Sequence, residues 1–418
     1  MKIFKFGGSS IHNARHIENF ADIIASNSSC QLVIVASAMD KTTNNLELLH
    51  KYFMEGRQEL LFKQWEKIKK FHYDILKELF GSEHTECNRK VEGLFFELEQ
   101  IVNGSPGGNE DLEYDRIVSY GELISTVILS DYLKKRGLNN KWLDARKLIC
   151  TDATYKDASV MWEQTEVQIK RAMDFSVCNR YITQGFIGAD TQGRTTTLGR
   201  EGSDFTAAII GYVLDSENVV VWKDVEGIYN KDPHKYSDAE KIKMLSYHET
   251  IELSYYGARV IHPKTIKPLQ NKRIPLYVKS FYLPEKKGTV ISAENQKVLP
   301  PIFIEKTNQT LLTIYPTDFS FIAEKHLEKL FFLLNKHKIK TSLLQHSAIS
   351  FSIVFDDHHK NFDTLVKALK TDFKVLYNTG LSLITVRHYT ERLLENLTAG
   401  KEIFIEQKTR KTARFVLK

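Results

Sequence analysis

Residues 2–10 read KIFKFGGSS, an apolar stretch that ends in a lysine, two glycines and two serines. Residues 2–6 fit a short buried strand. Successive glycines after such a strand let backbone N–H groups converge on an anion, because no Cβ blocks the approach. A following helix would add the partial positive charge of its N-terminus. The stretch therefore predicts either a cradle for phosphate oxygens or a plain strand-to-helix turn that carries a surface lysine.

The segments that follow extend this beginning into a sheet. Residues 31–36, QLVIVA, fit a second buried strand. Between the two strands, Ile17, Phe20, Ile23 and Ile24 recur at steps of three and four residues, which is typical of a helix. The order strand, helix, strand predicts a parallel α/β sheet.

Alternating helices and strands continue to about residue 293, with a mostly helical insertion over residues 45–135. One apolar stripe on this insertion consists of Leu61, Trp65, Ile68, Ile75 and Leu79. Further strands are expected at 180–188, 218–225 and 273–281, and helices at 203–214 and 245–261.

The pattern changes from residue 302 onward. Residues 302–390 alternate in the order βαββαβ, which is the ferredoxin-like plan. Residues 391–418 offer a short helix and two strands, and resemble a partial second copy of that unit. We therefore predict three parts, with boundaries at 1–293, 302–390 and 391–418.

The composition of the 418 residues is that of an ordinary globular protein, with 42% hydrophobic and 26% charged residues. The net charge of +6 is spread among acidic residues, so we expect no nucleic-acid partner. Four widely separated cysteines fit reduced intracellular thiols. No apolar run approaches the length of a membrane span, and we expect no signal peptide and no membrane partner. These features predict a cytoplasmic protein.

Further donors follow the second predicted strand. SAMDKTTNNL (37–46) offers Ser37, Lys41, Thr43 and Asn44 where ligands collect in open α/β sheets. The same residues also fit a capped helix start.

Glu122 lies in VSYGELIST (118–126), an otherwise apolar helical stretch. A buried carboxylate needs a cation or hydrogen-bond donors. Glu122 therefore fits either a structural ion pair or a group that holds the ammonium of a small substrate.

TTTLGREGSDFTAA (195–208) crowds polar groups in front of an apolar helix. Arg200 suits a carboxylate or a phosphate, because its planar guanidinium donates two parallel hydrogen bonds. Ser203 or Asp204 would also cap the helix. The density of donors favours a ligand.

Two last segments are rich in charge. In VVVWKDVEGIYNKDPHKY (219–236), Asp224 and Tyr229 could flank a nucleotide. In SYYGARVIHPKTI (254–266), Arg259 and Lys264 bracket His262, which we interpret as a hydrogen-bonded structural histidine.

Because these six segments occur together and in order, the chain resembles the aspartate kinases of the amino-acid kinase family. The family pattern K-F-G-G-T-S matches residues 5–10, with Ser9 in place of threonine. The remaining patterns are S-A-x-x-K-x-T-N at 37, G-E-x-x-S at 121, T-T-L-G-R-G-G-S-D at 196, W-T-D-V-x-G-I-Y-x-x-D-P at 222 and Y-x-G-A-K-V-x-H-P at 255. The resemblance implies a three-layer αβα sandwich with a mainly parallel sheet, followed by α+β ferredoxin-like ACT units.

The resemblance also implies an activity. Aspartate kinases use ATP and Mg²⁺ to phosphorylate the β-carboxylate of L-aspartate, and the 4-phospho-L-aspartate feeds the synthesis of lysine, threonine, methionine and diaminopimelate. The tail would bind a regulatory amino acid, threonine or lysine, and ACT-like units usually pair across subunits, which predicts a homodimer or a larger homo-oligomer.

By position, the resemblance assigns a role to each matching residue and names no protein ligand for a metal. The implied catalytic residues are Lys5 and Asp204. The implied substrate-binding residues are Ser37, Thr43, Glu122, Arg200 and Ser203. The implied phosphate- and nucleotide-binding residues are Gly7, Gly8, Ser9, Lys223, Asp224, Tyr229 and Arg259.

The chain departs from the family pattern at several positions. Glu201 replaces a glycine, so a negative side chain is expected near the substrate, and Arg259 replaces a lysine. Lys223 and His234 stand where many members carry threonine and arginine.

The regulatory tail departs further. The positions that hold the effector in lysine-inhibited relatives match Ser342 and Ser347-Ala348, which lack the family's carboxylates. This predicts weak or absent lysine inhibition through the usual geometry. Asp318 is either a substitute anion or a turn residue.

Two other functions fit parts of the sequence. One is another kinase of the same family, such as a uridylate kinase, and the other is a non-catalytic amino-acid sensor. Glu122 and residues 200–204 argue against the first, and an intact Lys5, Glu122 and Asp204 argue against the second. A fusion with homoserine dehydrogenase is not expected, because no G-x-G-x-x-G motif follows a strand.

Overall fold

The computed structural model describes residues 1–418 except 82–84, 259–260, 295–297, 319 and 358–360. The chain divides into two compact units, each built from several segments. Unit 1 comprises Met1–Ile228, Lys241–Ser254 and Arg259–Gln296. Unit 2 comprises Tyr229–Glu240, Tyr255–Ala258 and Lys297–Lys418.

Unit 1 is built on an eight-stranded sheet in the order β10-β12-β11-β7-β1-β2-β4-β3. Neighbouring strands are parallel except β11 and β12, so the sheet is mainly parallel, as predicted. The strands are β1 (Lys2–Phe6), β2 (Leu32–Ala36), β3 (Lys141–Leu143), β4 (Arg180–Gln184), β7 (Asn218–Lys223), β10 (Met244–Ser246), β11 (Leu276–Ser280) and β12 (Thr289–Ser292).

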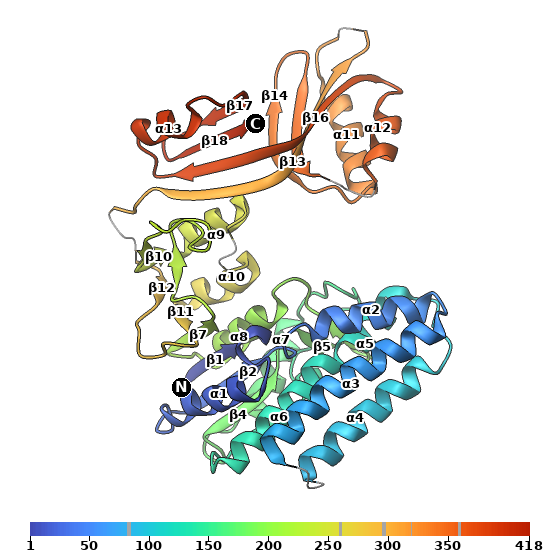
Figure 1. Cartoon of the computed structure of the whole chain (residues 1–418), viewed down its shortest axis with the longest axis vertical. Helices are drawn as coiled ribbons and strands as arrows, with labels where there is room; N and C mark the ends of the chain where they lie inside the picture. The colour runs from blue at the N-terminus through green and yellow to red at the C-terminus, as the bar shows by residue number, and fades with distance from the viewer. Residues whose placement is uncertain (82–84, 259–260, 295–297, 319, 358–360) are drawn as a thin grey trace. The chain divides into compact units, whose positions relative to one another are not determined.

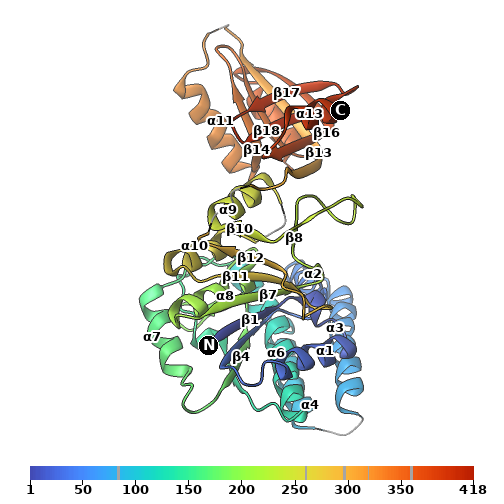
Figure 2. The same ribbon diagram turned by 90° about the vertical axis from the view of Figure 1, so that its left-hand side faces the viewer.

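The central strands are apolar because helices cover both faces of the sheet (Figures 1 and 2). On one face, Phe4 and Phe6 of β1 join a core with helix α1 (Ala14–Ala25) and the helical insertion. Opposite it, α8 (Gly202–Val213) packs on β1 and β7, and α7 (Trp162–Ala172) and α10 (Pro263–Lys272) pack against α8.

The helices predicted within residues 45–135 are confirmed. The helical insertion consists of α2 (Thr42–Met54), α3 (Gln58–Phe80), α4 (Glu86–Val102), α5 (Glu110–Val118) and α6 (Tyr120–Lys135). All five members of the predicted apolar stripe are buried, because α3 presents them to the core of unit 1.

Two predicted elements end at least four residues before their predicted ends. The strand predicted over 180–188 ends with β4, and residues beyond it form β5 (Ile187–Ala189), which pairs with β6 (Thr195–Thr197) in a separate sheet. The chain turns between them because Phe186 has a positive φ of 72°. The helix predicted over 245–261 is α9 (Tyr247–Tyr256), which ends before Gly257 at a φ of 104°.

Unit 2 carries a six-stranded sheet in the order β14-β15-β13-β16-β18-β17, with antiparallel neighbours. The predicted βαββαβ order is confirmed by β13 (Ile302–Pro316), α11 (Glu324–Lys336), β14 (Thr341–His346), β15 (Phe351–Asp356), α12 (Phe362–Leu369) and β16 (Phe373–Arg387). The tail adds α13 (Glu391–Thr398), β17 (Ile403–Lys408) and β18 (Thr412–Leu417). Because β13 and β16 are 15 residues long each and pair along most of their length, they carry the βαββαβ segment and the tail in one sheet.

The segment Tyr255–Ala258 belongs to unit 2 although it lies within the predicted catalytic domain. The ring of Tyr256 lies 5.1 Å from the guanidinium carbon of Arg414 and 5.7 Å from that of Arg387. Both arginines are buried in the sheet of unit 2. The division into three domains at 1–293, 302–390 and 391–418 stays a prediction.

None of the helices in the described part of the chain combines the length and the apolar composition that a bilayer crossing needs.

Candidate active site

The candidate site is organised by the carboxyl ends of the parallel strands. Phe6 of β1 stands in register with Ala36 of β2 and Trp222 of β7. The chain therefore continues into three neighbouring segments at one edge of the sheet, beginning at residues 7, 37 and 224. Open α/β sheets bind ligands at this edge.

Lys5 and Asp204 form an ion pair at this edge. The Lys5 ammonium lies 2.7 Å from Oδ1 of Asp204, and both side chains are largely removed from solvent. Burial alone would raise the pKa of Asp204, but the charges of Lys5 and Lys223 and the hydrogen bond from Lys5 outweigh it and hold the pKa below its usual range. Asp204 is therefore ionised at neutral pH and fixes the position of the Lys5 ammonium.

Gly8 lies where two chain segments almost touch. A Cβ on Gly8 would lie 2.6 Å from the carbonyl oxygen of Ala38 and 2.9 Å from that of Asp40. The amide of Asp40 donates to the carbonyl of Gly8 over 3.1 Å, and the amide of Ser37 donates to the carbonyl of Phe6 over the same distance. Residues 7–10 are thus tied to the segment after β2, and only glycine fits at this contact.

Glu122 faces the same segment from α6. Its Oε1 accepts a hydrogen bond of 3.1 Å from the amide of Ala38, and its Oε2 has no partner among the described residues. Burial raises the pKa of Glu122 to about 8, although the Ala38 amide and the Lys5 charge oppose the shift. A Cβ on Gly121 would lie 2.9 Å from Cβ of Ala38, so Gly121 permits this close approach.

The remaining predicted substrate residues lie on helix ends and in a loop. Thr43 is half-buried in the first turn of α2, and Ser203 is buried in the first turn of α8. Ser37 accepts a hydrogen bond of 2.8 Å on its carbonyl from the Ser125 hydroxyl. Arg200 is exposed in residues 199–202, a loop segment that ends the connection from β6 and includes the first residue of α8.

The predicted phosphate- and nucleotide-binding residues lie in different parts of the structure. Gly7 and Ser9 flank Gly8 after β1, and Ser9 is exposed. Lys223 ends β7, and Asp224 follows it with an exposed side chain. Tyr229 belongs to unit 2, and Arg259 lies outside the described residues.

His262 is a helix cap. Its Nδ1 accepts a hydrogen bond of 3.2 Å from the amide of Lys264, so the imidazole caps the N-terminus of α10. Burial lowers the pKa of His262 against the opposing charge of Glu201. The interpretation of His262 as a hydrogen-bonded structural residue is confirmed.

Sequence reasoning missed Asp115, which is fully buried at the end of α5. Its carboxylate accepts hydrogen bonds from the Thr197 amide (2.8 Å), the Thr197 hydroxyl (2.7 Å) and the Lys156 amide (3.0 Å). Burial raises the pKa of Asp115 to about 6 against these hydrogen bonds. Asp115 thereby fixes the strand that leads into residues 199–202, and nothing in its local sequence distinguishes it from a surface aspartate.

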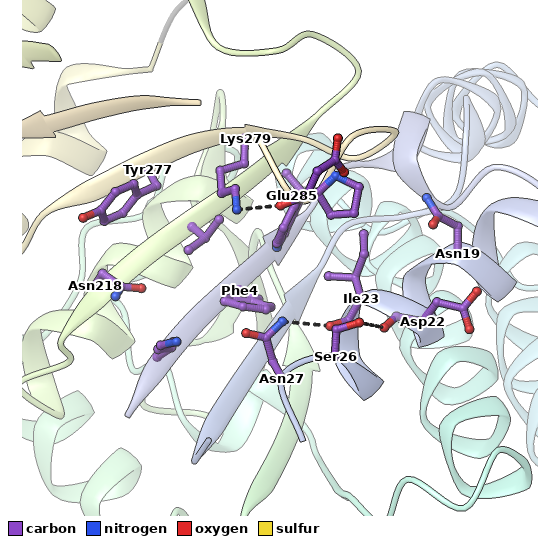
Figure 3. A pocket seen from close by; sticks show the side chains of 14 residues that line it. Phe4, Asn19, Asp22, Ile23, Ser26, Asn27, Asn218, Tyr277, Lys279 and Glu285 are labelled. Atoms are coloured by element: carbon purple, nitrogen blue, oxygen red, sulfur yellow. Dashed lines mark hydrogen bonds between the residues drawn. The ribbon is translucent and has the colours of Figure 1, made fainter. Parts of the chain in front are cut away.

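A separate cavity of about 540 Å³ lies on the face of the sheet that carries Phe4 and Trp222 (Figure 3). Strands β1, β7 and β11 form its floor, and Asn19, Asp22 and Asn27 line it from α1 and the residues after it. None of the predicted site residues lines this cavity. The Lys5 side chain interacts with α8 on the other face, so the cavity is distinct from the site at the strand ends.

No metal centre is built into the described residues, among which no group of three or more histidine, cysteine, aspartate or glutamate side chains could hold an ion.

The fold and site define a phosphotransferase class. The sequence model of the amino acid kinase family matches residues 1–280, and the chain belongs to that family.

The chain is similar to several aspartokinases in sequence and in structure. The chain is 29% identical to the lysine-sensitive aspartokinase 3 of Escherichia coli K12 over 416 residues, which cover 96% of this chain and 90% of that protein. It is 33% identical to the chloroplastic aspartokinase 2 of Arabidopsis thaliana over 375 residues, or 85% of this chain and 66% of that one. The crystal structure of E. coli aspartokinase III with aspartate and ADP superposes with a TM-score of 0.84 at 26% identity, covering 100% of this chain and 96% of that one.

The ion pair predicts a pH-dependent stability. Replacing Lys5 with methionine leaves the Asp204 charge buried, which we expect to lower the free energy of unfolding by about 3–5 kcal/mol at pH 7. In this variant Lys5 no longer opposes burial, so the pKa of Asp204 rises and the carboxyl becomes neutral at low pH. The loss should therefore shrink as the pH falls toward 4. Urea denaturation of Lys5→Met at both pH values measures this difference.

The control is Lys5→Met combined with Asp204→Asn, which removes the stranded charge and should recover most of the lost stability at pH 7. An equal loss in the single and the double variant would contradict the assignment.

Proposed function

We propose that this chain is an aspartate kinase, which transfers the γ-phosphoryl group of ATP to the β-carboxylate of L-aspartate. The single observation that carries the proposal concerns one sheet edge. This edge brings together an ion-paired lysine and a buried carboxyl with an oxygen that no described residue hydrogen-bonds. The similarity to aspartokinases along nearly the whole chain supports the same activity.

The reaction needs no general base, because the carboxylate of aspartate is already a nucleophile. One of its oxygens forms a bond to the γ-phosphorus while the bond from that phosphorus to the bridging oxygen of ADP breaks. The obstacle is the repulsion between two anions, which the enzyme overcomes by oriented positive charge and positioning. Lys5, held by Asp204, would supply that charge, and the backbone amides of Gly7, Gly8 and Ser9 would donate to phosphate oxygens beside it.

Aspartate binding is assigned to groups at the same strand edge. Glu122 would hold the α-ammonium with its free oxygen, and Arg200 would pair with the α-carboxylate. Ser37, Thr43 and Ser203 would donate or accept further hydrogen bonds. These roles follow the family pattern, and the buried, incompletely hydrogen-bonded carboxyl of Glu122 supports the first of them.

The nucleotide would bind along the segment after β7, with Lys223, Asp224, Tyr229 and Arg259 in the roles that the resemblance implies. Mg²⁺ in kinases is held mainly by phosphates and one or two carboxylates, and the exposed carboxylate of Asp224 fits such a ligand. When bound, the ion would neutralise charge on the transferring phosphate.

Unit 2 is proposed to bind a regulatory amino acid, lysine or threonine, and to pair with a second copy of the chain. The Ser342 hydroxyl accepts a hydrogen bond from Lys306 over 3.2 Å, and the Ser342 carbonyl accepts one from Arg414 over 2.6 Å. This cationic setting suits an effector carboxylate better than an ammonium. Asp318 accepts a hydrogen bond of 3.0 Å from the Ser320 amide, which supports its role as a turn residue. The cytoplasmic location stays a prediction.

A coupled assay of ADP release tests the function. We expect ADP formation that depends on L-aspartate and is absent with UMP. The same assay with added lysine, threonine or methionine identifies the effector. Turnover with UMP, or amino-acid binding without any turnover, would instead favour a uridylate kinase or a sensor.

The raised pKa of Glu122 predicts that aspartate binding releases a proton. Below pH 8 the free carboxyl is protonated, and it must ionise to pair with an ammonium. The fraction in the binding form then rises about tenfold per pH unit, and KM for aspartate should fall by about that factor between pH 6 and 7. Steady-state kinetics across this range check the slope.

Glu122→Gln serves as the reference for this slope, because it cannot ionise. Its KM for aspartate should be raised. After correction for the pH dependence of KM for ATP, it should also be nearly independent of pH. If Glu122→Gln keeps the pH dependence of KM for aspartate that the unchanged enzyme shows, Glu122 is excluded as the source of that dependence.

A further inference from the structure

Glu201 adopts a backbone conformation that usually requires glycine. Its φ of 55° and ψ of 27° lie in the left-handed region, directly before helix α8. Residues other than glycine are strained in this conformation and persist there only where other contacts compensate. The Glu201 side chain makes such a contact.

The Glu201 carboxylate bonds to a distant part of the chain. Its Oε2 accepts a hydrogen bond of 2.8 Å from the amide of His262, the capping residue of α10. This amide lies at the start of a ten-residue helix, where a negative charge is favourable. One side of the loop of residues 199–202 is therefore anchored to α10.

A second anchor reaches the other side of the loop from the same place. The Lys264 ammonium forms an ion pair with Asp157. A Cβ on Gly199 would lie 2.4 Å from Oδ1 of Asp157, so the backbone of Gly199 rests directly on that carboxylate. Residues 262–264 thus hold the loop at Gly199 and at Glu201, on either side of Arg200.

Arg200 has no anchor of its own. Its side chain is exposed, and none of the described residues makes a hydrogen bond or an ion pair with its guanidinium. The direction in which it leaves the loop is set by the backbone between the two anchors. Since the Glu201 side chain provides one anchor through a single hydrogen bond, losing its carboxylate would leave that side held only by the backbone hydrogen bonds from the Asp204 and Phe205 amides to the Glu201 carbonyl.

We propose that Glu201 is a positioning residue, which aims Arg200 at the α-carboxylate of aspartate by tying residues 199–202 to the start of α10. This inference rests on the proposed function and extends it. It explains how a glutamate is tolerated at a left-handed position, where its strain is offset by the contact with His262. Glu201 acts through Arg200 and does not itself touch the substrate.

The test compares Glu201→Gly with Glu201→Gln. Glycine relieves the strained backbone, so Glu201→Gly should unfold at the same or a higher urea concentration than the unchanged chain. It should nevertheless raise KM for aspartate about tenfold, with kcat and KM for ATP within about twofold, because only uniform substrate binding is weakened. Glu201→Gln keeps an acceptor oxygen and should recover most of the aspartate affinity.

Two further variants complete the design. Lys264→Met removes the other anchor and should raise KM for aspartate in the same direction. Asp215→Asn breaks the 2.5 Å ion pair with Lys272 at the far end of α10 and should leave KM unchanged. The dissociation constant of aspartate, measured by calorimetry, should follow KM in all variants.

The possible results are distinct. A chain that turns over aspartate with the same KM in Glu201→Gly overturns the positioning role and leaves the proposed function intact. A lower KM in both Glu201 variants also overturns it, because the carboxylate would then act only as a repelling charge. A chain that neither binds nor phosphorylates aspartate overturns both proposals.

Discussion

The ion pair between Lys5 and Asp204 is the interaction on which the rest of the site depends. Each partner would be costly to bury alone, and together they fix the end of β1 against the start of α8. That junction determines where residues 7–10 leave the sheet and where residues 199–202 enter the helix. The site is thus assembled from segments far apart in sequence by one electrostatic requirement.

The same strand edge holds two carboxyl groups in opposite states. Asp204 faces two lysines, which keep its pKa low in spite of burial. Glu122 is also buried, but its nearest partner is a neutral amide, so its pKa rises to about 8. Environments that push the pKa values of neighbouring acids apart are typical of sites that bind or move charge. Here Asp204 would hold a permanent cation, and Glu122 would become charged when a substrate ammonium arrives.

Much of the fold could be predicted from local patterns. The apolar runs at 2–6 and 31–36 became the central strands, because parallel strands covered on both faces need continuous apolar sequence. The single sheet of unit 2 was not predicted, since nothing in 302–316 shows that one strand serves two segments.

The site was predictable only where residues adjacent in the sequence indicate its chemistry. Lysine and glycines after a strand point to an anion, and an acid in an apolar helix points to a missing partner. Asp115 was missed because its partners lie 41 and 82 residues away, and Glu201 was predicted near the substrate without its partner His262, 61 residues away. Such contacts exist only after folding.

The most direct test of the central claim is the turnover number of Lys5→Met, measured as aspartate-dependent ADP release at saturating substrates in a sample that still shows a cooperative unfolding transition. If the Lys5 charge is what allows one anion to attack another, kcat should fall about a hundredfold to a thousandfold, by analogy with the removal of a single preorganised donor at a site of developing charge. A folded Lys5→Met enzyme with the turnover of the unchanged chain would contradict the account.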